Sequence, residues 1–182
     1  MNLIVLLDGS RIRSIVNCLT LLLWLGVAIA CAQQSSVPVP NAIRSVLDKK
    51  EYRGWRLAES PREVQEYFRH QRVSFAPNLL SGDFNGDGKR DYALLIEHRN
   101  RLIALAFVNK GRGFTKHTLE TPPKGEVPVY LWLYRKGERD TDYETGKEFT
   151  YRTDAVGVMY YEKAGVSYVC ERGRFRRVIT SD

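Results

Sequence analysis

The strongest constraint on the fold is a succession of short, apolar, strand-like runs that begins near Leu79 and continues to the end of the chain. Tight-turn sequences such as residues 98–101 and 110–113 separate these runs. Parallel neighbours would need a long crossover, and no helical segment lies between the runs. The pattern therefore predicts a mainly antiparallel β-meander sheet built from residues 92–97, 102–108, 114–119, 129–134, 148–153, 156–161, 166–170 and 175–179.

Two helices are expected before the strands. Asn41 opens the first, where its side chain can accept a bond from the first-turn amides, and apolar residues follow at helical spacing. Ser60 opens the second as a capping residue, with Pro61 at the first helical position and Glu63 closing a capping box. The expected fold class is α+β, with two N-terminal helices packed against the antiparallel sheet or its edge.

The N-terminal segment has the pattern of a secretory signal. Residues 15–30 are apolar and uncharged, Arg11 and Arg13 precede them, and small residues follow. The run is shorter than the roughly 20 residues that span a bilayer. We therefore expect residues 1–32 to be a signal peptide, residues 33–40 a tether, and residues 41–182 a single domain.

Two processing routes stay open at the end of that signal. Ala28, Ala30 and Ala32 supply the small residues for ordinary cleavage. Residues 27–31 also resemble a bacterial lipobox ending in Cys31, although Ala28 stands where Leu is usual. Both routes predict an exported protein, periplasmic or secreted, and the second adds a lipid anchor to the envelope.

The charge and the cysteines limit the classes of partner and of cross-link. Arg11, Arg13 and Asp8 account for +1 of the net charge of +7, which leaves +6 for the chain after Ala32. The cations are scattered, and residues 171–177 form the clearest basic block, which we interpret as a solvated strand face; we expect no nucleic acid partner. Cys170 alone is certain to remain after processing, so we expect a buried structural thiol and no intramolecular disulfide.

One loop carries a specific chemical pattern. Asp83, Asn85, Asp87 and Asp91 stand at positions one, three, five and nine of residues 83–91, and the backbone carbonyl of Lys89 falls at position seven. Calcium takes six to eight oxygen ligands at about 2.3–2.6 Å. Gly86 and Gly88 supply the permissive dihedral angles of a sharp turn. We predict that these five residues bind Ca²⁺; an Asx-rich turn without metal is the alternative.

The loop resembles the calcium loop of FG-GAP/VCBS-type repeats, the kind found in integrin propellers, with the pattern D-x-[DN]-x-D-G-x-x-D ahead of a hydrophobic strand. The chain is also similar to single-domain exported bacterial proteins with one such segment. It has a single loop of this kind, so the resemblance does not imply a propeller. It also departs from an EF-hand, because Leu94 stands at position twelve and a strand follows.

A second acidic run, residues 140–148, repeats the acids at positions one, three, five and nine but has Thr145 where a loop glycine is needed. We predict a solvated loop there, and metal binding by it stays open. Tyr130, Trp132 and Tyr134 share one face of a strand, which suits either a core or a sugar-binding surface.

No catalytic arrangement is apparent in the sequence. His70, His98 and His117 lack the spacing of a zinc site, and neither a nucleophile elbow nor a phosphate loop is present. A hydrolase would need acids or histidines brought together in space.

We therefore expect a non-enzymatic, calcium-binding module of the cell envelope. It would engage a protein or glycan partner and would meet the membrane only through its signal or a lipid anchor. The alternative is a periplasmic inhibitor or immunity-type protein that acts on a wall-degrading hydrolase.

Overall fold

A computed structural model describes residues 38–49, 51–123, 125 and 127–181. The chain divides into two compact units, Met1–Ser35 and Ser36–Asp182, and the elements below belong to the second. The predicted signal peptide and the lipobox at Cys31 lie outside the described residues. Among the residues that are described, no helix has the length and apolar character needed to cross a membrane.

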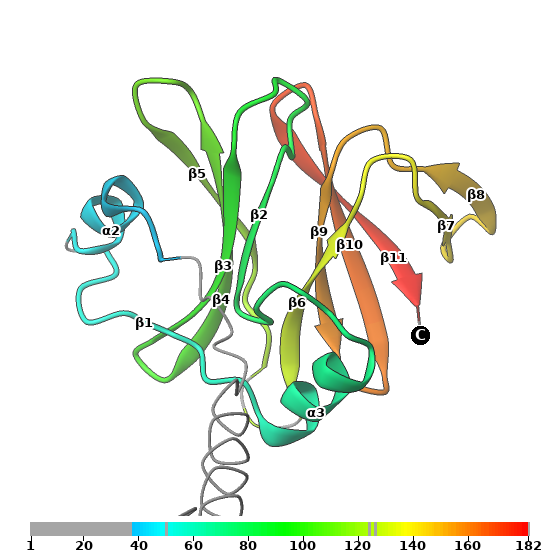
Figure 1. Ribbon diagram of the computed structural model, residues 1–182, viewed down its shortest axis with the longest axis horizontal. Helices are drawn as coiled ribbons and strands as arrows, with labels where there is room; N and C mark the ends of the chain where they lie inside the picture. The colour runs from blue at the N-terminus through cyan, green and yellow to red at the C-terminus, as the bar shows by residue number, and fades with distance from the viewer. Residues whose placement is uncertain (1–37, 50, 124, 126, 182) are drawn as a thin grey trace, which may run out of the picture. The chain divides into compact units, whose positions relative to one another are not determined.

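The first sheet has five antiparallel strands, with β3 paired to β1, β2 and β4, and β4 paired to β5 (Figure 1). Arg99 and Asn100 join β3 to β4 with φ angles of 48° and 63°. Two successive left-handed residues match the right-handed twist of a hairpin, so this tight turn is confirmed. The strands are β1 (Arg56–Leu57), β2 (Leu79–Gly82), β3 (Asp91–His98), β4 (Arg101–Asn109) and β5 (Phe114–Glu120).

The second sheet has four antiparallel strands in the order β11-β10-β9-β6. Pro122 and Pro123 follow β5 and lack the amide hydrogen needed to continue pairing, so the chain leaves the first sheet there. The strands that were expected to form one meander sheet are therefore divided mainly between two sheets. The strands are β6 (Val129–Tyr134), β9 (Ala155–Tyr160), β10 (Ala164–Glu171) and β11 (Arg174–Ser181).

The second acidic run forms a hairpin; residues 143–148 are exposed, as predicted, but the run pairs as strands and is not an irregular loop. β7 (Arg139–Asp142) pairs with β8 (Lys147–Thr150), which form a two-stranded sheet of their own. Gly146 takes the left-handed position of the turn, with φ 66° and its amide bonded to the Asp142 carbonyl at 2.7 Å. Asp140 accepts a bond from the Tyr151 hydroxyl at 2.8 Å, so one of these acids is used to hold the hairpin.

The main core lies between the two sheets. Side chains alternate across each strand, so one face of each sheet turns inward. The shared cluster joins Leu80, Ala93 and Leu95 of the first sheet to Leu131 and Val158 of the second. Burying such side chains stabilises the fold by about 1.5–3 kcal/mol each relative to exposure.

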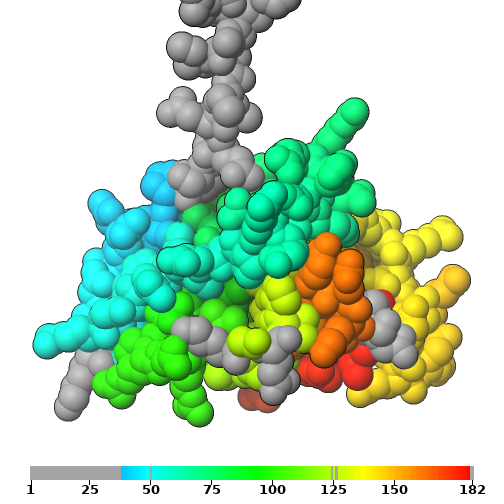
Figure 2. Space-filling view, turned by 90° about the horizontal axis from the view of Figure 1, so that it is seen from below, coloured from blue at the N-terminus to red at the C-terminus, as the bar shows by residue number. Residues whose placement is uncertain are grey.

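Two short helices cover the outer faces. α2 (Asn41–Leu47) buries Ile43 and Leu47 against the first sheet. α3 (Arg62–His70) buries Val64 and Phe68 against Tyr130 on β6. Figure 2 shows the α3 segment lying against the later strands of the chain.

Both predicted helix caps are wrong. Pro40 and Pro61 stand at the N-cap positions, and neither helix has a side-chain capping bond. The capping box from Ser60 is not formed; instead, the Gln65 side-chain amide donates to the Ser60 carbonyl at 2.6 Å. Val39 belongs to the core, so the end of the predicted tether is packed structure.

The aromatic face of β6 is a packing surface. Tyr67 and Phe68 of α3 contact Tyr130 and Trp132 with ring centroids 5.4–6.3 Å apart. Tyr134 stacks on Tyr151 with centroids 4.7 Å apart. The ladder is therefore covered by α3 and by the segment after β8.

Candidate metal centre

The predicted calcium loop connects β2 to β3. Gly82 and Asp91 are paired partners at the ends of these strands, so the pairing closes the loop at its base. This register brings position one, Asp83, close to position nine, Asp91, although seven residues separate them along the chain. The geometry of the site is thus fixed by strand pairing as well as by the turn.

The Asp83 carboxylate organises the turn. Its Oδ1 accepts bonds from the amides of Gly86 and Asp87 at 2.8 and 3.0 Å, and its Oδ2 accepts one from Gly88 at 2.9 Å. Gly86 and Gly88 have φ angles of 75° and 77°, in the left-handed region that favours glycine. The two glycines therefore permit the sharp turn that the sequence predicted, and the amide bonds to Asp83 are also those expected of an Asx-rich turn.

Asp91 is a fully buried carboxylate, with 0% of its surface exposed. Its Oδ2 accepts a bond from the Phe84 amide at 2.9 Å, and its Oδ1 accepts one from Asn109 at 2.7 Å. Burial raises its pKa although these amides, with that of Asn85, act in the opposite direction. No lysine or arginine of the described chain forms an ion pair with it. A buried charge without a counter-charge is costly, and a bound cation would offset that cost.

Asn85 and Asp87 complete the side-chain set. Asn85 accepts a bond from the Asp87 amide at 3.1 Å. Asp87 Oδ1 accepts one from the Lys89 amide at 2.9 Å, which is the main cause of its lowered pKa. The ammonium of Lys89 lies 3.1 Å from Asp87 Oδ2, so the side chain of position seven pairs with position five.

The side chains of Asp83, Asn85, Asp87 and Asp91 are of the chemical type that a hard cation prefers. All four side chains present oxygen, and a carboxylate offers about four acceptor positions. Asp83 accepts three amide bonds, which leaves it room for another. The loop does not gather three carboxylates at one point: nowhere in the described ranges do three or more Asp, Glu, His or Cys side chains form a group suited to a metal.

The loop is attached to the second sheet by contacts that the sequence did not indicate. Thr153 donates its hydroxyl to the Phe84 carbonyl at 3.0 Å. Asp154 Oδ2 accepts a bond from the Asp83 amide, and the Asp154 amide donates to the Asp83 carbonyl, both at 3.2 Å. A Cβ on Gly82 would stand 2.8 Å from that same Oδ2, so the two segments meet at a glycine. The loop therefore bridges the two sheets.

Phe84 and Asp154 make further contacts that connect the loop to the core and to the segment after β6. Phe84 has no exposed surface and packs in the core between the sheets. Asp154 also accepts bonds from Arg135 at 3.2 Å and from the Lys136 amide at 3.1 Å. A hollow of about 350 Å³ beside the loop is lined by Asp83, Lys89 and Arg135 among others. No spacing in the sequence marks Thr153 or Asp154, because their partners are some 70 residues away.

The histidines and the cysteine lie on separate elements. His70 ends α3, His98 packs on Tyr52 with centroids 5.7 Å apart, and His117 packs on Phe175 at 5.2 Å. Cys170 is half-buried, and burial raises the pKa of its thiol. Ring packing accounts for His98 and His117, whereas His70 is exposed.

Comparisons with protein-family models, with curated proteins and with solved structures find no match for this chain. Its function is therefore inferred from its own residues and their geometry.

Proposed function

We propose that this protein is an exported, non-enzymatic binding module of the cell envelope that holds one calcium ion in the loop of residues 83–91. Asp83, Asn85, Asp87 and Asp91 would supply side-chain oxygens, and Lys89 would supply its backbone carbonyl. The sequence pattern of FG-GAP/VCBS-type loops supports this assignment. The signal-like residues 1–32 support export.

The buried carboxylate of Asp91 is the observation that carries the proposal. It has no exposed surface and is bonded to amides at 2.7 and 2.9 Å. Amides orient a carboxylate but do not neutralise its charge, so a divalent cation at the loop would remove a cost that the fold otherwise bears. Its position at the base of the loop makes it the ligand through which an ion would act on β3.

The expected role of calcium is to stiffen the junction of the two sheets. The loop carries Phe84 into the core and contacts Thr153 and Asp154 just before β9. An ion that orders the loop would therefore stabilise both sheets together, since binding energy at a site formed on folding becomes folding energy. The bound ion would supply charge compensation, while the chain's own residues supply orientation.

Thermal unfolding in calcium and in EDTA tests the proposal. We expect calcium to raise the midpoint of unfolding, and Asp87→Ala to remove that increase. Asp87 is partly exposed, so the substitution opens no core cavity. An unchanged midpoint in the unaltered protein would refute calcium binding.

Glu144→Ala is the matched control, because it removes one carboxylate from the second acidic run, where Glu144 is exposed. It should keep the full response to calcium. Loss of the response in this variant would instead assign the ion to residues 140–148. Mass spectrometry of the mature N-terminus tests export separately, and an intact Met1 would contradict it.

A further inference from the structure

A hollow of about 1180 Å³ lies beside the β7–β8 hairpin, on the outer face of the second sheet. Arg152 after β8, Arg172 in the β10–β11 turn, and Arg174 and Arg176 on β11 line it. Phe149 and Val169 add apolar surface. The sequence marked residues 171–177 as a basic block but gave no sign that Arg152 joins them.

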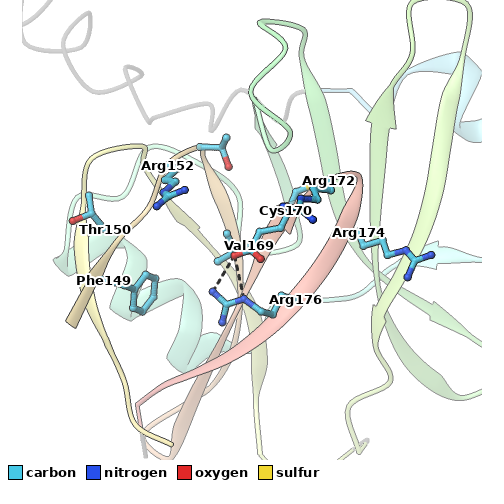
Figure 3. A pocket seen from close by; sticks show the side chains of 10 residues that line it. Phe149, Thr150, Arg152, Val169, Cys170, Arg172, Arg174 and Arg176 are labelled. Carbon is cyan, nitrogen blue, oxygen red and sulfur yellow. Dashed lines mark hydrogen bonds and ion pairs between the residues drawn. The ribbon is translucent and has the colours of Figure 1, made fainter. Parts of the chain in front are cut away.

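Strand register explains why Arg174 and Arg176 lie on the same face of the sheet. Arg174 is paired with Glu171, and Arg176 is paired with Val169. Side chains of directly opposed residues in an antiparallel pair share a face, so both arginines lie on the face of Val169. Figure 3 shows Arg176 turned toward Phe149, with Arg152 on the same side as Phe149, whereas the Arg174 side chain extends away from them at the other end of the group.

The hollow is positively charged overall. Arg176 Nε and Nη2 both bond to Glu171 Oε1 at 3.1 Å. In the part of the chain that the structure describes, no carboxylate forms an ion pair with Arg152, Arg172 or Arg174. All three side chains belong to exposed residues. Three guanidinium groups are therefore available to a ligand.

The chemistry favours carboxylates on a chain. The cations are all arginines, whose planar donors match carboxylate and phosphate groups in pairs. Ligand pockets for small molecules usually measure about 300–1,000 Å³, and this open hollow exceeds that range. Glu171 already occupies one arginine and would repel a doubly charged phosphate more strongly than a single carboxylate. Phe149 and Val169 suit the apolar side chains of a peptide.

We propose that this hollow binds an acidic segment of a partner protein, whose Asp or Glu side chains pair with Arg152, Arg172 and Arg174. The inference rests on the proposed function only in treating the protein as a binding module, and it names the partner chemistry. It does not require calcium.

Fluorescence anisotropy with a labelled peptide of alternating glutamate and leucine tests the site. The peptide should bind, and the same peptide with glutamine in place of glutamate should not. The double variant Arg152→Gln, Arg174→Gln should weaken binding about tenfold or more, since two close charge pairs are lost. The matched double variant Arg53→Gln, Arg112→Gln loses the same charge from exposed arginines outside the hollow and should bind normally.

Three results would overturn the inference: no binding of the glutamate peptide, an equal loss in both double variants, or tighter binding of polyphosphate or phosphatidylglycerol vesicles than of the peptide. Repeating the titration in EDTA and with Asp87→Ala separates the two proposals. Peptide binding that persists without calcium supports the hollow even if the melts refute the ion. A calcium-dependent midpoint with no peptide binding supports the ion alone.

Discussion

Thr153 donates its hydroxyl to the backbone carbonyl of Phe84 at 3.0 Å, across 69 positions of sequence. Phe84 belongs to the β2–β3 loop, and Thr153 lies just before β9 of the other sheet. The methyl group of the same threonine also lies against the loop: if Gly86 carried a Cβ, that atom would lie 2.9 Å from Thr153 Cγ2. The proposed calcium loop is therefore held by the sheet opposite to its own.

Gly86→Ala should destabilise the protein more than Gly88→Ala. Both glycines have left-handed φ angles, which cost an alanine about 1–2 kcal/mol. A new Cβ at position 86 also meets Thr153 Cγ2 at 2.9 Å, whereas nothing lies within 4 Å at position 88. Urea unfolding should show a difference of about 1 kcal/mol or more between the variants.

Thr153→Ser removes that methyl group and keeps the hydroxyl. In the Gly86→Ala background it should recover part of the lost stability. If it recovers none, the contact with Thr153 is not the cause.

Lys89→Gln should strengthen calcium binding by up to about fivefold. The ammonium of Lys89 pairs with Asp87 at 3.1 Å and competes with an ion, and an exposed pair is worth about 1 kcal/mol at most. The backbone carbonyl proposed as a ligand is retained. Calorimetric titration measures the change, with Lys136→Gln as a control of equal charge whose ammonium makes no ion pair with a described residue. Weaker binding in Lys89→Gln would contradict the competition.

Removing the Glu51 charge should reduce the loss of stability in acid. Lys116 bonds to Glu51 Oε2 at 2.6 Å, and this bond, together with one from Tyr52, lowers the pKa of Glu51 below 4.5. A lowered carboxyl pKa gives stability that is present above pH 4.5 and lost as the pH falls through the folded-state value. Glu51→Gln should reduce the change in unfolding free energy over this pH range by less than about 1 kcal/mol, because Glu51 is largely exposed and solvent screens the pair.

Denaturant unfolding of both proteins across this range measures the difference. A slope unaltered by Glu51→Gln would contradict the assignment.

Gly157→Ala should destabilise the second sheet by about 1–3 kcal/mol through overpacking. An added Cβ would lie 3.0 Å from Trp132 Cβ and from Tyr134 Cε2. β9 lies beside β6 in the same sheet, and Gly157 is paired with Trp132. Gly113→Ala is the control, because nothing lies within 4 Å of its added Cβ. Thermal unfolding of the two variants measures the difference. Equal midpoints would show that Trp132 and Tyr134 can move aside without loss of stability.

Sequence patterns predicted the features that depend on residues close together in the chain. Apolar runs predicted the strands β3, β4 and β6, and the turn at Arg99 and Asn100 followed from its position between two strands. The turn glycines of the loop also followed from residue type and spacing, whereas the sequence predicted Asp83 as a metal ligand and did not predict its amide bonds within the turn. The predicted caps were wrong because residue type alone does not fix the cap position: Pro40 and Pro61 occupy the N-caps, and the helices begin at Asn41 and Arg62.

The sequence by itself determined that the chain forms antiparallel strands with a tightly curled, oxygen-rich loop, because propensity, alternation and turn chemistry act between near neighbours. Only the tertiary structure decided that the strands divide into two sheets, that Asp91 is buried, that Thr153 and Asp154 hold the loop, and that Arg152 joins Arg174 beside one hollow. These relationships join residues far apart in the chain, and the packing of one sheet on another fixes them.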